Sequence, residues 1–109
     1  VAERADGAIV GVLPLTFVRS ALFGRALVSA GFGVGGGCLA HDAATVRALA
    51  DAAWALAQRL GCPGVELRGG PPPGPDWTSD DHTYLGFVRD LAADDAAELL
   101  AIPRKQRAE

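Results

Sequence analysis

The sequence contains no methionine, only two cysteines and only two histidines among its 109 residues. Its apolar runs are interrupted by glycine or by charge well short of the roughly 20 residues that a membrane-spanning helix needs. It also lacks a signal-peptide pattern, a Walker loop and a G-x-S-x-G nucleophile elbow. These absences argue against a membrane span and against several common hydrolase and nucleotide-binding motifs, and they predict a cytoplasmic protein.

The few potential metal ligands do not follow a metal-binding pattern. Cys38 and Cys62 lie at opposite ends of a helix predicted over residues 43–60, which would be about 27 Å long, whereas a disulfide requires Cα atoms within about 7 Å. We therefore expect two free thiols, as suits a reducing compartment. His41 and His82 have no cysteine or carboxylate at ligand spacing, so we interpret both as surface or capping residues and expect no metal.

The composition is that of one small globular domain. Hydrophobic residues make up 50% of the chain, and the net charge is −3. An acidic chain gives no argument for DNA or for an anionic membrane as a partner. Because the chain opens at Val1 in a strand-like run and stops at Glu109 in a charged helical pattern, we expect it to be a piece of a longer protein.

The strongest periodic pattern lies over residues 43–60 and predicts one long amphipathic helix. Asp42 precedes it as an N-cap, and Gly61 follows it where a left-handed residue is favoured. Trp54 lies beside the apolar stripe and is expected to cover its edge. The stripe itself recurs at spacings of three and four, as one face of a helix requires; its members are Val46, Leu49, Ala50, Ala53, Leu56, Ala57 and Leu60.

Strand-like segments surround this helix. One over 25–30 precedes a glycine-rich connection and one over 65–68 follows the helix, so we predict a parallel β-α-β crossover. Upstream, a short lead over 1–3, an Asp-Gly turn and a long run over 8–18 with Pro14 predict, together with 25–30, a three-stranded antiparallel meander. The predicted fold class is α/β (α+β), a mixed sheet with an antiparallel meander followed by a β-α-β unit.

The second half of the chain is less regular. Residues 69–81 are rich in proline and glycine and predict an extended loop, in which Trp77 is the one large apolar side chain able to pin the loop to the body. An alternating pattern over 82–91 predicts a fifth strand. Asp94 is the predicted cap of a final helix over 95–102.

Residues 31–36, Gly-Phe-Gly-Val-Gly-Gly, fit the G-x-G-x-x-G pattern of dinucleotide-binding loops. The pattern follows a strand and precedes a helix, but residues 38–42 separate it from the helix, and the preceding strand belongs to an antiparallel meander. Glu66 lies too far along the chain for the usual ribose contact. We favour a flexible connection with close backbone packing over a nucleotide site.

The C-terminal stretch is the most cationic one. Arg104, Lys105 and Arg107 lie within four residues, and this density favours phosphate or carboxylate partners. The alternative is a solvated helix end, whose cations suit the negative end of the helix dipole. Pro103 is expected to interrupt the preceding helix and to start or kink the next one.

The proline-rich loop also contains three carboxylates, Asp76, Asp80 and Asp81. Most clusters of this kind in loops are solvated. A substrate contact is the alternative, because functional residues concentrate on loops.

Several short motifs occur along the chain in a specific order. They are 11–15 (GVLPL), 22–24 (LFG), the glycine-rich run, 65–68 (VELR), 75–77 (PDW) and 102–108 (IPRKQRA). In this order they resemble the FemAB-like branch of the GNAT acyltransferase superfamily, in particular the bacterial FemAB-related proteins associated with the PEP-CTERM/exosortase system. The resemblance extends over nearly the whole chain.

The resemblance implies two GNAT-like domains in tandem with the substrate bound between them, and this chain would be the middle-to-late part of the first. Characterised relatives transfer an amino acid from aminoacyl-tRNA to a peptidoglycan precursor peptide. For the whole protein it implies an acyl-CoA or aminoacyl-tRNA donor and a cell-envelope or exopolysaccharide-related amine acceptor. The acetyl-CoA signature Q/R-x-x-G-x-G/A is absent ahead of the helix, so no cofactor is expected in this piece, which alone is expected to be inactive.

A transferase of this type mainly positions an amine and stabilises a developing oxyanion. No residue is an obvious general base, and Glu66 and His82 are the catalytic candidates. The substrate-binding candidates are Arg104, Lys105, Arg107, Asp76 and Trp77. Expected partners are the second GNAT-like domain and an anionic or envelope-precursor substrate. A second hypothesis stays open, a non-catalytic GNAT-like module that binds an anionic ligand or a protein partner.

Overall fold

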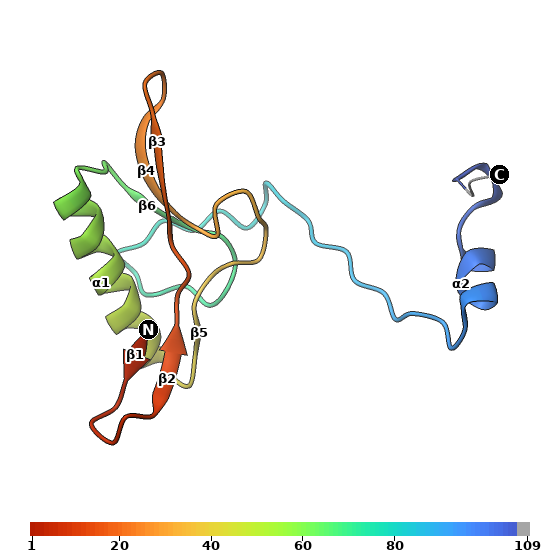
Figure 1. Cartoon of the computed structure of the whole chain (residues 1–109), viewed down its shortest axis with the longest axis horizontal. Coiled ribbons are helices and arrows are strands. Elements are labelled where there is room, and N and C mark those ends of the chain that lie inside the picture. Colours follow the sequence, from red (N-terminus) through yellow and green to blue (C-terminus); the bar gives the residue numbers. More distant parts are fainter. Residues whose placement is uncertain (107–109) are drawn as a thin grey trace. The chain divides into compact units, whose positions relative to one another are not determined.

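A computed structural model describes residues 1–106 of the chain. The chain divides into two compact units, Val1–Ser79 and Asp80–Glu109, which we call the first unit and the second unit. The first unit contains all the described strands and the long helix α1, and the second unit contains the short helix α2 and a single 3₁₀ turn, η1 (Figure 1).

The first unit contains two three-stranded sheets. In one, β2 (Ile9–Val12) lies between β1 (Ala2–Glu3) and β5 (Leu39–Ala40), and both pairings are antiparallel. In the other, β4 lies between β3 and β6; their bounds are β3 (Thr16–Ser20), β4 (Gly24–Ser29) and β6 (Val65–Leu67). With two helices and these sheets the protein is a mixed α and β fold, which confirms the predicted class at this level.

Helix α1 (Ala43–Leu60) has the predicted bounds and caps. The Asp42 carboxylate accepts a hydrogen bond of 2.7 Å from the Thr45 backbone N–H, which satisfies one of the free donors of the first turn. Gly61 ends the helix in the left-handed region with φ 66°, and the Cys62 N–H returns to the Ala57 carbonyl at 2.8 Å. This is the closing geometry for which glycine is favoured.

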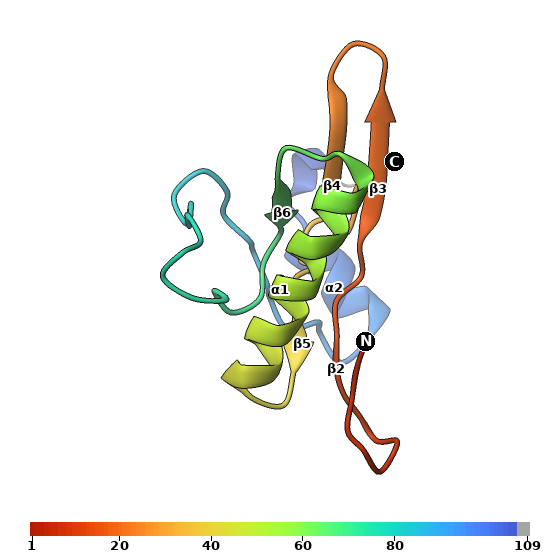
Figure 2. The ribbon, with the colours of Figure 1, turned by 90° about the vertical axis from the view of Figure 1, so that its left-hand side faces the viewer.

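The core lies where α1 crosses the two sheets. Figure 2 shows β5 near the N-terminal end of α1, and β4 and β6 near its C-terminal half. The N-terminal half contributes Val46 and Leu49 to one buried cluster with Cys38. The C-terminal half contributes Ala57 to a second cluster with Leu27. One helix thus supplies apolar side chains to both clusters, and Trp54, 45% exposed, lies beside this stripe as predicted.

The predicted parallel crossover is confirmed. Strands β4 and β6 run parallel, with Leu27 opposite Val65 and Ser29 opposite Leu67, and α1 lies between them in the sequence. Just beyond the last pair, the Ser29 hydroxyl accepts a hydrogen bond of 3.0 Å from the Arg68 N–H.

The predicted meander is wrong. The run over 8–18 does not form one strand, because residues 13–15 are not part of a ladder and the chain passes there from β2 into β3 of the other sheet. Pro14 accounts for the break, since it has no N–H to donate to a ladder. Instead of a three-stranded meander, the structure has a β1–β2 hairpin in one sheet and a β3–β4 hairpin in the other.

The fifth strand predicted over 82–91 is also wrong. These residues are exposed and form no strand within the described chain. Alternation alone does not make a strand, because an extended segment needs a neighbour to pair its N–H and C=O groups. Helix α2 (Asp95–Ala101) is confirmed with Asp94 as its cap, and η1 (Arg104–Gln106) follows Pro103.

Both cysteines are free, as predicted, and the structure shows that both are buried. Burial raises the pKa of the Cys38 thiol above its ordinary value, and its sulfur lies 4.0 Å from the Val46 carbonyl oxygen. A protonated, buried thiol of this kind is a packing residue rather than a nucleophile.

The Asp42 cap predicts a pH dependence of folding. The hydrogen bonds from Thr45 lower the pKa of Asp42 below its ordinary value. A depressed carboxyl pKa stabilises the fold above the unfolded pKa, and this contribution is lost as the pH falls through about 4 towards the folded pKa. We expect Asp42→Asn to keep the cap but to flatten this part of a stability–pH profile measured by chemical denaturation. Asp42→Ala should lower stability at neutral pH, and equal profiles for all three proteins would contradict the assignment.

Candidate functional site

One face of α1 carries two charged side chains and an indole at helical spacing. Arg47, Asp51 and Trp54 stand at positions i, i+4 and i+7, so the helix places them one above another. The Arg47 Nε lies 3.3 Å from a carboxylate oxygen of Asp51. This face is half exposed rather than buried, and the proline-rich loop lies against it.

The loop reaches α1 through Asp76. A carboxylate oxygen of Asp76 accepts a hydrogen bond of 2.7 Å from Arg47 Nη2. This bond, followed by the charge of Asp51, raises the pKa of Arg47 above its ordinary value. A Cβ at position 74 would lie 2.2 Å from Arg47 Nη1, so a side chain there would require the end of the Arg47 side chain to shift.

These groups line a hollow of about 460 Å³ in the first unit. Trp54 from the helix and Trp77 from the loop supply two indole rings, and two carboxylates outnumber the single guanidinium. Such walls suit a group with an apolar body and a positive charge, because indole faces attract cations. The lining residues are Arg47, Asp51, Trp54, Gly64, Val65, Asp76, Trp77 and Thr78.

The two catalytic candidates do not come together in one unit. Glu66 lies on β6, where its carboxylate accepts a bond of 2.5 Å from the Arg68 Nε. His82 belongs to the second unit, and its side chain is 95% exposed. The backbone N–H of His82 donates to the Asp80 carboxylate at 3.1 Å. Hydrogen bonds from the Thr83 hydroxyl and from nearby backbone amides lower the pKa of Asp80.

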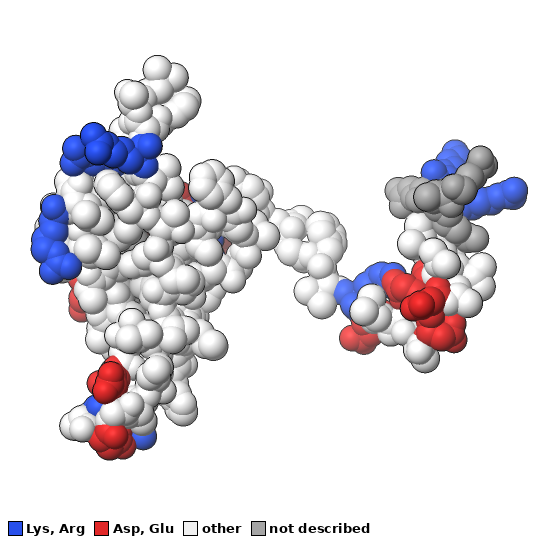
Figure 3. Space-filling model, viewed as in Figure 1, with Lys and Arg blue, Asp and Glu red and all other residues white. Residues whose placement is uncertain are grey.

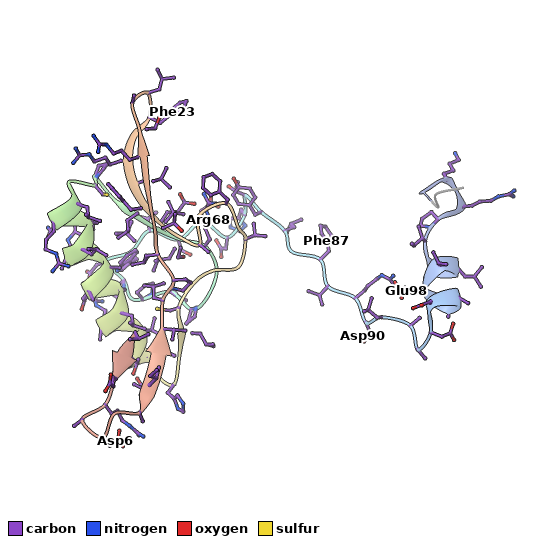
Figure 4. All side chains as sticks on the ribbon, viewed as in Figure 1. Asp6, Phe23, Arg68, Phe87, Asp90 and Glu98 are labelled. Carbon is purple, nitrogen blue, oxygen red and sulfur yellow. The ribbon has the colours of Figure 1, made fainter. Side chains whose placement is uncertain are left out.

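The glycine-rich run is packed against another part of the backbone. The Gly36 N–H donates to the Arg68 carbonyl at 2.7 Å, and a Cβ on Gly37 would lie 1.6 Å from the Gly69 carbonyl oxygen. Arg68, labelled in Figure 4, also places its Nη1 3.4 Å from the Gly33 carbonyl. The close-packing interpretation is therefore confirmed, and the Gly36 amide is not available to cradle a phosphate.

The three cationic substrate-binding candidates belong to the second unit. Arg104 and Lys105 stand in η1 and are exposed. Arg107 lies outside the described residues. In α2 of the same unit, Glu98 forms an ion pair with Arg89 and accepts a bond of 2.8 Å from the Ala92 N–H (Figure 4).

Sequence reasoning named Asp76 and Trp77 but missed their partners Arg47, Asp51 and Trp54. A signal was present, because charged residues of opposite sign at i and i+4, with an indole at i+7, mark one polar face of an otherwise alanine-rich helix. The sequence does not show that Arg47 of the helix contacts Asp76 of the loop. Such a contact depends on where residues 69–75 place Asp76.

Comparison of the chain with protein-family models, curated proteins and solved structures gives no match. Within residues 1–106, no three side chains of His, Cys, Asp or Glu come together as a possible metal site. Neither of the described α-helices has the length and apolarity needed to cross a bilayer.

We expect the Arg47–Asp76 pair to hold the loop in place. Arg47→Met should speed hydrogen exchange at the Trp77 N–H, which donates to the Gly74 carbonyl at 3.2 Å. The pair is exposed, so the expected change is modest, up to about fivefold. Asp51→Asn is the matched control, since it removes only the bond within the helix. Equal acceleration by both substitutions would show that the loop is held by other contacts.

Proposed function

We propose that the chain is part of an acyl- or aminoacyl-transferase of the FemAB/GNAT type, acting on an amine acceptor of the cell envelope or of an exopolysaccharide. The observation that supports it best is the parallel pairing of β4 with β6 through α1, directly after the antiparallel β3–β4 hairpin. An antiparallel hairpin followed by a strand–helix–strand unit is part of the order of elements that the resemblance implies. The protein would act in the cytoplasm, which suits its two free thiols.

In this proposal the hollow beside α1 holds the amine acceptor. An ammonium group would lie between the Trp54 and Trp77 rings, where cation–π attraction is available. Asp51 and Asp76 supply compensating negative charge, and Arg47 keeps both carboxylates in place. The chain would thus contribute the positioning part of catalysis, which is worth several orders of magnitude in rate.

Binding to the hollow can be followed directly, because Trp54 and Trp77 are the two tryptophans of the chain and both line it. A primary alkylamine should quench or shift the tryptophan emission, whereas the alcohol of the same length should have a smaller effect. Asp76→Asn should weaken the amine response several-fold, since a charge-assisted contact is lost. Equal responses to amine and alcohol would contradict a cation site.

In this proposal catalysis is tested with the full-length product of the gene. We would assay acyl-CoA and aminoacyl-tRNA donors with amine acceptors, using Glu66→Gln and His82→Gln. A general base contributes about 10²- to 10⁴-fold, so loss of that size at one position would identify it. If all proteins transfer equally, neither residue is the base. If none transfers while the amine still binds, the transferase proposal fails.

The cationic end would hold phosphate or carboxylate groups of the donor or acceptor. Arg104 and Lys105 are exposed and thus accessible to an anion. Arg104→Ala combined with Arg107→Ala should weaken binding of an anionic substrate analogue to the full-length protein and flatten its salt dependence. Unchanged affinity and salt slope would leave these residues as a solvated helix end.

The second candidate function is a non-catalytic binding module for an anionic ligand or a protein partner. It is favoured by one observation, that the Glu66 carboxylate is already paired with Arg68. Retention of ligand binding without transfer in the full-length assay would support it.

A further inference from the structure

The β3–β4 hairpin of the first unit ends in an exposed apolar tip. Leu22 is 84% exposed and Phe23 is 88% exposed, and Figure 4 shows Phe23 at the far end of the hairpin. Their backbone N–H groups donate to the Ser20 hydroxyl at 3.2 and 3.1 Å, and Gly24 completes the turn with φ 80°. The tip therefore has a defined shape that holds two large apolar side chains in solvent.

Three arginines lie below this tip, and we call them the arginine band: Arg19, Arg25 and Arg59. Arg19 and Arg25 are directly opposite each other in the β3–β4 ladder, so their side chains leave the same face. Arg25 donates to the Leu60 carbonyl at 3.1 Å, which brings it to the last turn of α1, where Arg59 lies. Figure 3 shows basic side chains gathered directly below the uncharged tip.

Folding by itself does not favour this arrangement. Like charges directly opposite in a ladder repel, and an exposed leucine or phenylalanine gains no burial energy. None of the three arginines forms an ion pair with any carboxylate of residues 1–106. A partner with an apolar interior behind a negatively charged layer would bury the two apolar side chains and neutralise the three arginines.

We propose that this hairpin docks on an anionic lipid surface, with its tip in the headgroup–acyl boundary and the arginine band at the lipid phosphates. Leu22 lies three residues beyond Arg19 and Phe23 two residues before Arg25, so the tip extends at most about 7–10 Å beyond the band at the rise of a strand. Interfacial segments bury their apolar groups to about 5–10 Å, so the dimensions agree. Guanidinium groups bind phosphate oxygens in a bidentate manner, which suits the band.

A second copy of the chain is a less suitable occupant. A two-fold contact through the tips would place one arginine band near the other, because such an interface pairs the same patch on both subunits. This would add repulsion instead of relieving it. The lipid surface supplies the opposite charge, and the docking does not depend on the proposed transferase activity.

The test is sedimentation of the 109-residue chain with two kinds of vesicle, phosphatidylcholine alone and equal parts phosphatidylcholine and phosphatidylglycerol. We expect binding to the anionic vesicles, weak binding to the neutral ones and release by salt. Leu22→Ser with Phe23→Ser should abolish most binding. Arg19→Gln should lower the partition coefficient about fivefold, as expected for one cation near an anionic surface. Val34→Ser, which changes another exposed apolar residue, is the matched control and should have no effect.

Circular dichroism melts would show that the variants fold, since Leu22, Phe23 and Arg19 are exposed and make no side-chain contact with the buried clusters. Equal binding to both vesicle types, or binding that the tip substitutions leave unchanged, would overturn the proposal. A third outcome would also overturn it: the unsubstituted chain self-associates and binds no vesicles, and the tip substitutions make it monomeric. In that case the tip would be a protein–protein contact.

Discussion

Leu27→Ala should lower the free energy of unfolding of the first unit by about 2–5 kcal/mol, the range found when a buried leucine is truncated. Leu27 is 1% exposed on the central strand β4, where it packs with Ala57 of α1 and with Cys62. Its removal would leave a cavity between sheet and helix that β4 cannot move to close, because β4 is fixed by ladders to β3 on one side and to β6 on the other. Urea denaturation followed by tryptophan emission would measure the loss.

Leu39→Ala is the matched control for this substitution. Leu39 also lies in a strand, but it is 74% exposed. Its truncation should change stability by less than about 0.5 kcal/mol, as is typical of surface sites. If the two substitutions cost the same, the buried cluster around Leu27 is not the core of this unit.

The helix and its caps were predictable because their signals are local. The apolar spacing within 43–60, the Asp42 acceptor and the Gly61 end all act over four residues or fewer, and each depends on backbone geometry that the sequence itself specifies. The parallel pairing of β4 and β6 was predictable for a related reason. A helix between two strands leaves few ways to bring them into one sheet.

The division into two sheets could not be read from the sequence. Pro14 is compatible with a bulge, an edge position or a corner, and only the pairing of β2 with the distant β5 decides among them. The same holds for residues 82–91, whose alternation says nothing about whether a neighbouring strand exists. The alternation of apolar and polar residues shows which side chains share a face of a segment. Whether the segment pairs with another strand depends on the fold of the whole chain.

The candidate site divides in the same way. Asp76 and Trp77 were found because charged and aromatic residues are conspicuous in a proline-rich loop. Arg47 was overlooked because an arginine on a helix is ordinarily a solvated residue, and its role depends on the contact with Asp76 from the distant loop.

The glycine-rich run provides the second large effect. We expect Gly37→Ala to destabilise the first unit by about 3 kcal/mol, at the upper end of the cost of overpacking. A Cβ at this position would lie 1.6 Å from the carbonyl oxygen of Gly69 and 2.3 Å from its carbonyl carbon. Both atoms belong to the backbone, so no side-chain rotation can relieve the overlap, and the segment after β6 would have to move.

Gly33→Ala separates this overlap from the general effect of replacing glycine. Neither Gly33 nor Gly37 has a positive φ, and the nearest atom to a Cβ on Gly33 is the Ala30 carbonyl oxygen at 3.7 Å, an ordinary contact. Both substitutions restrict the unfolded chain equally, which by itself stabilises by about 0.4–1 kcal/mol. Gly33→Ala should therefore be neutral or slightly stabilising in urea denaturation, while Gly37→Ala is strongly destabilising. Equal stability of the two variants would mean that residues 36–37 are not packed on Gly69, and the interpretation of this run as a phosphate-binding loop would regain its place.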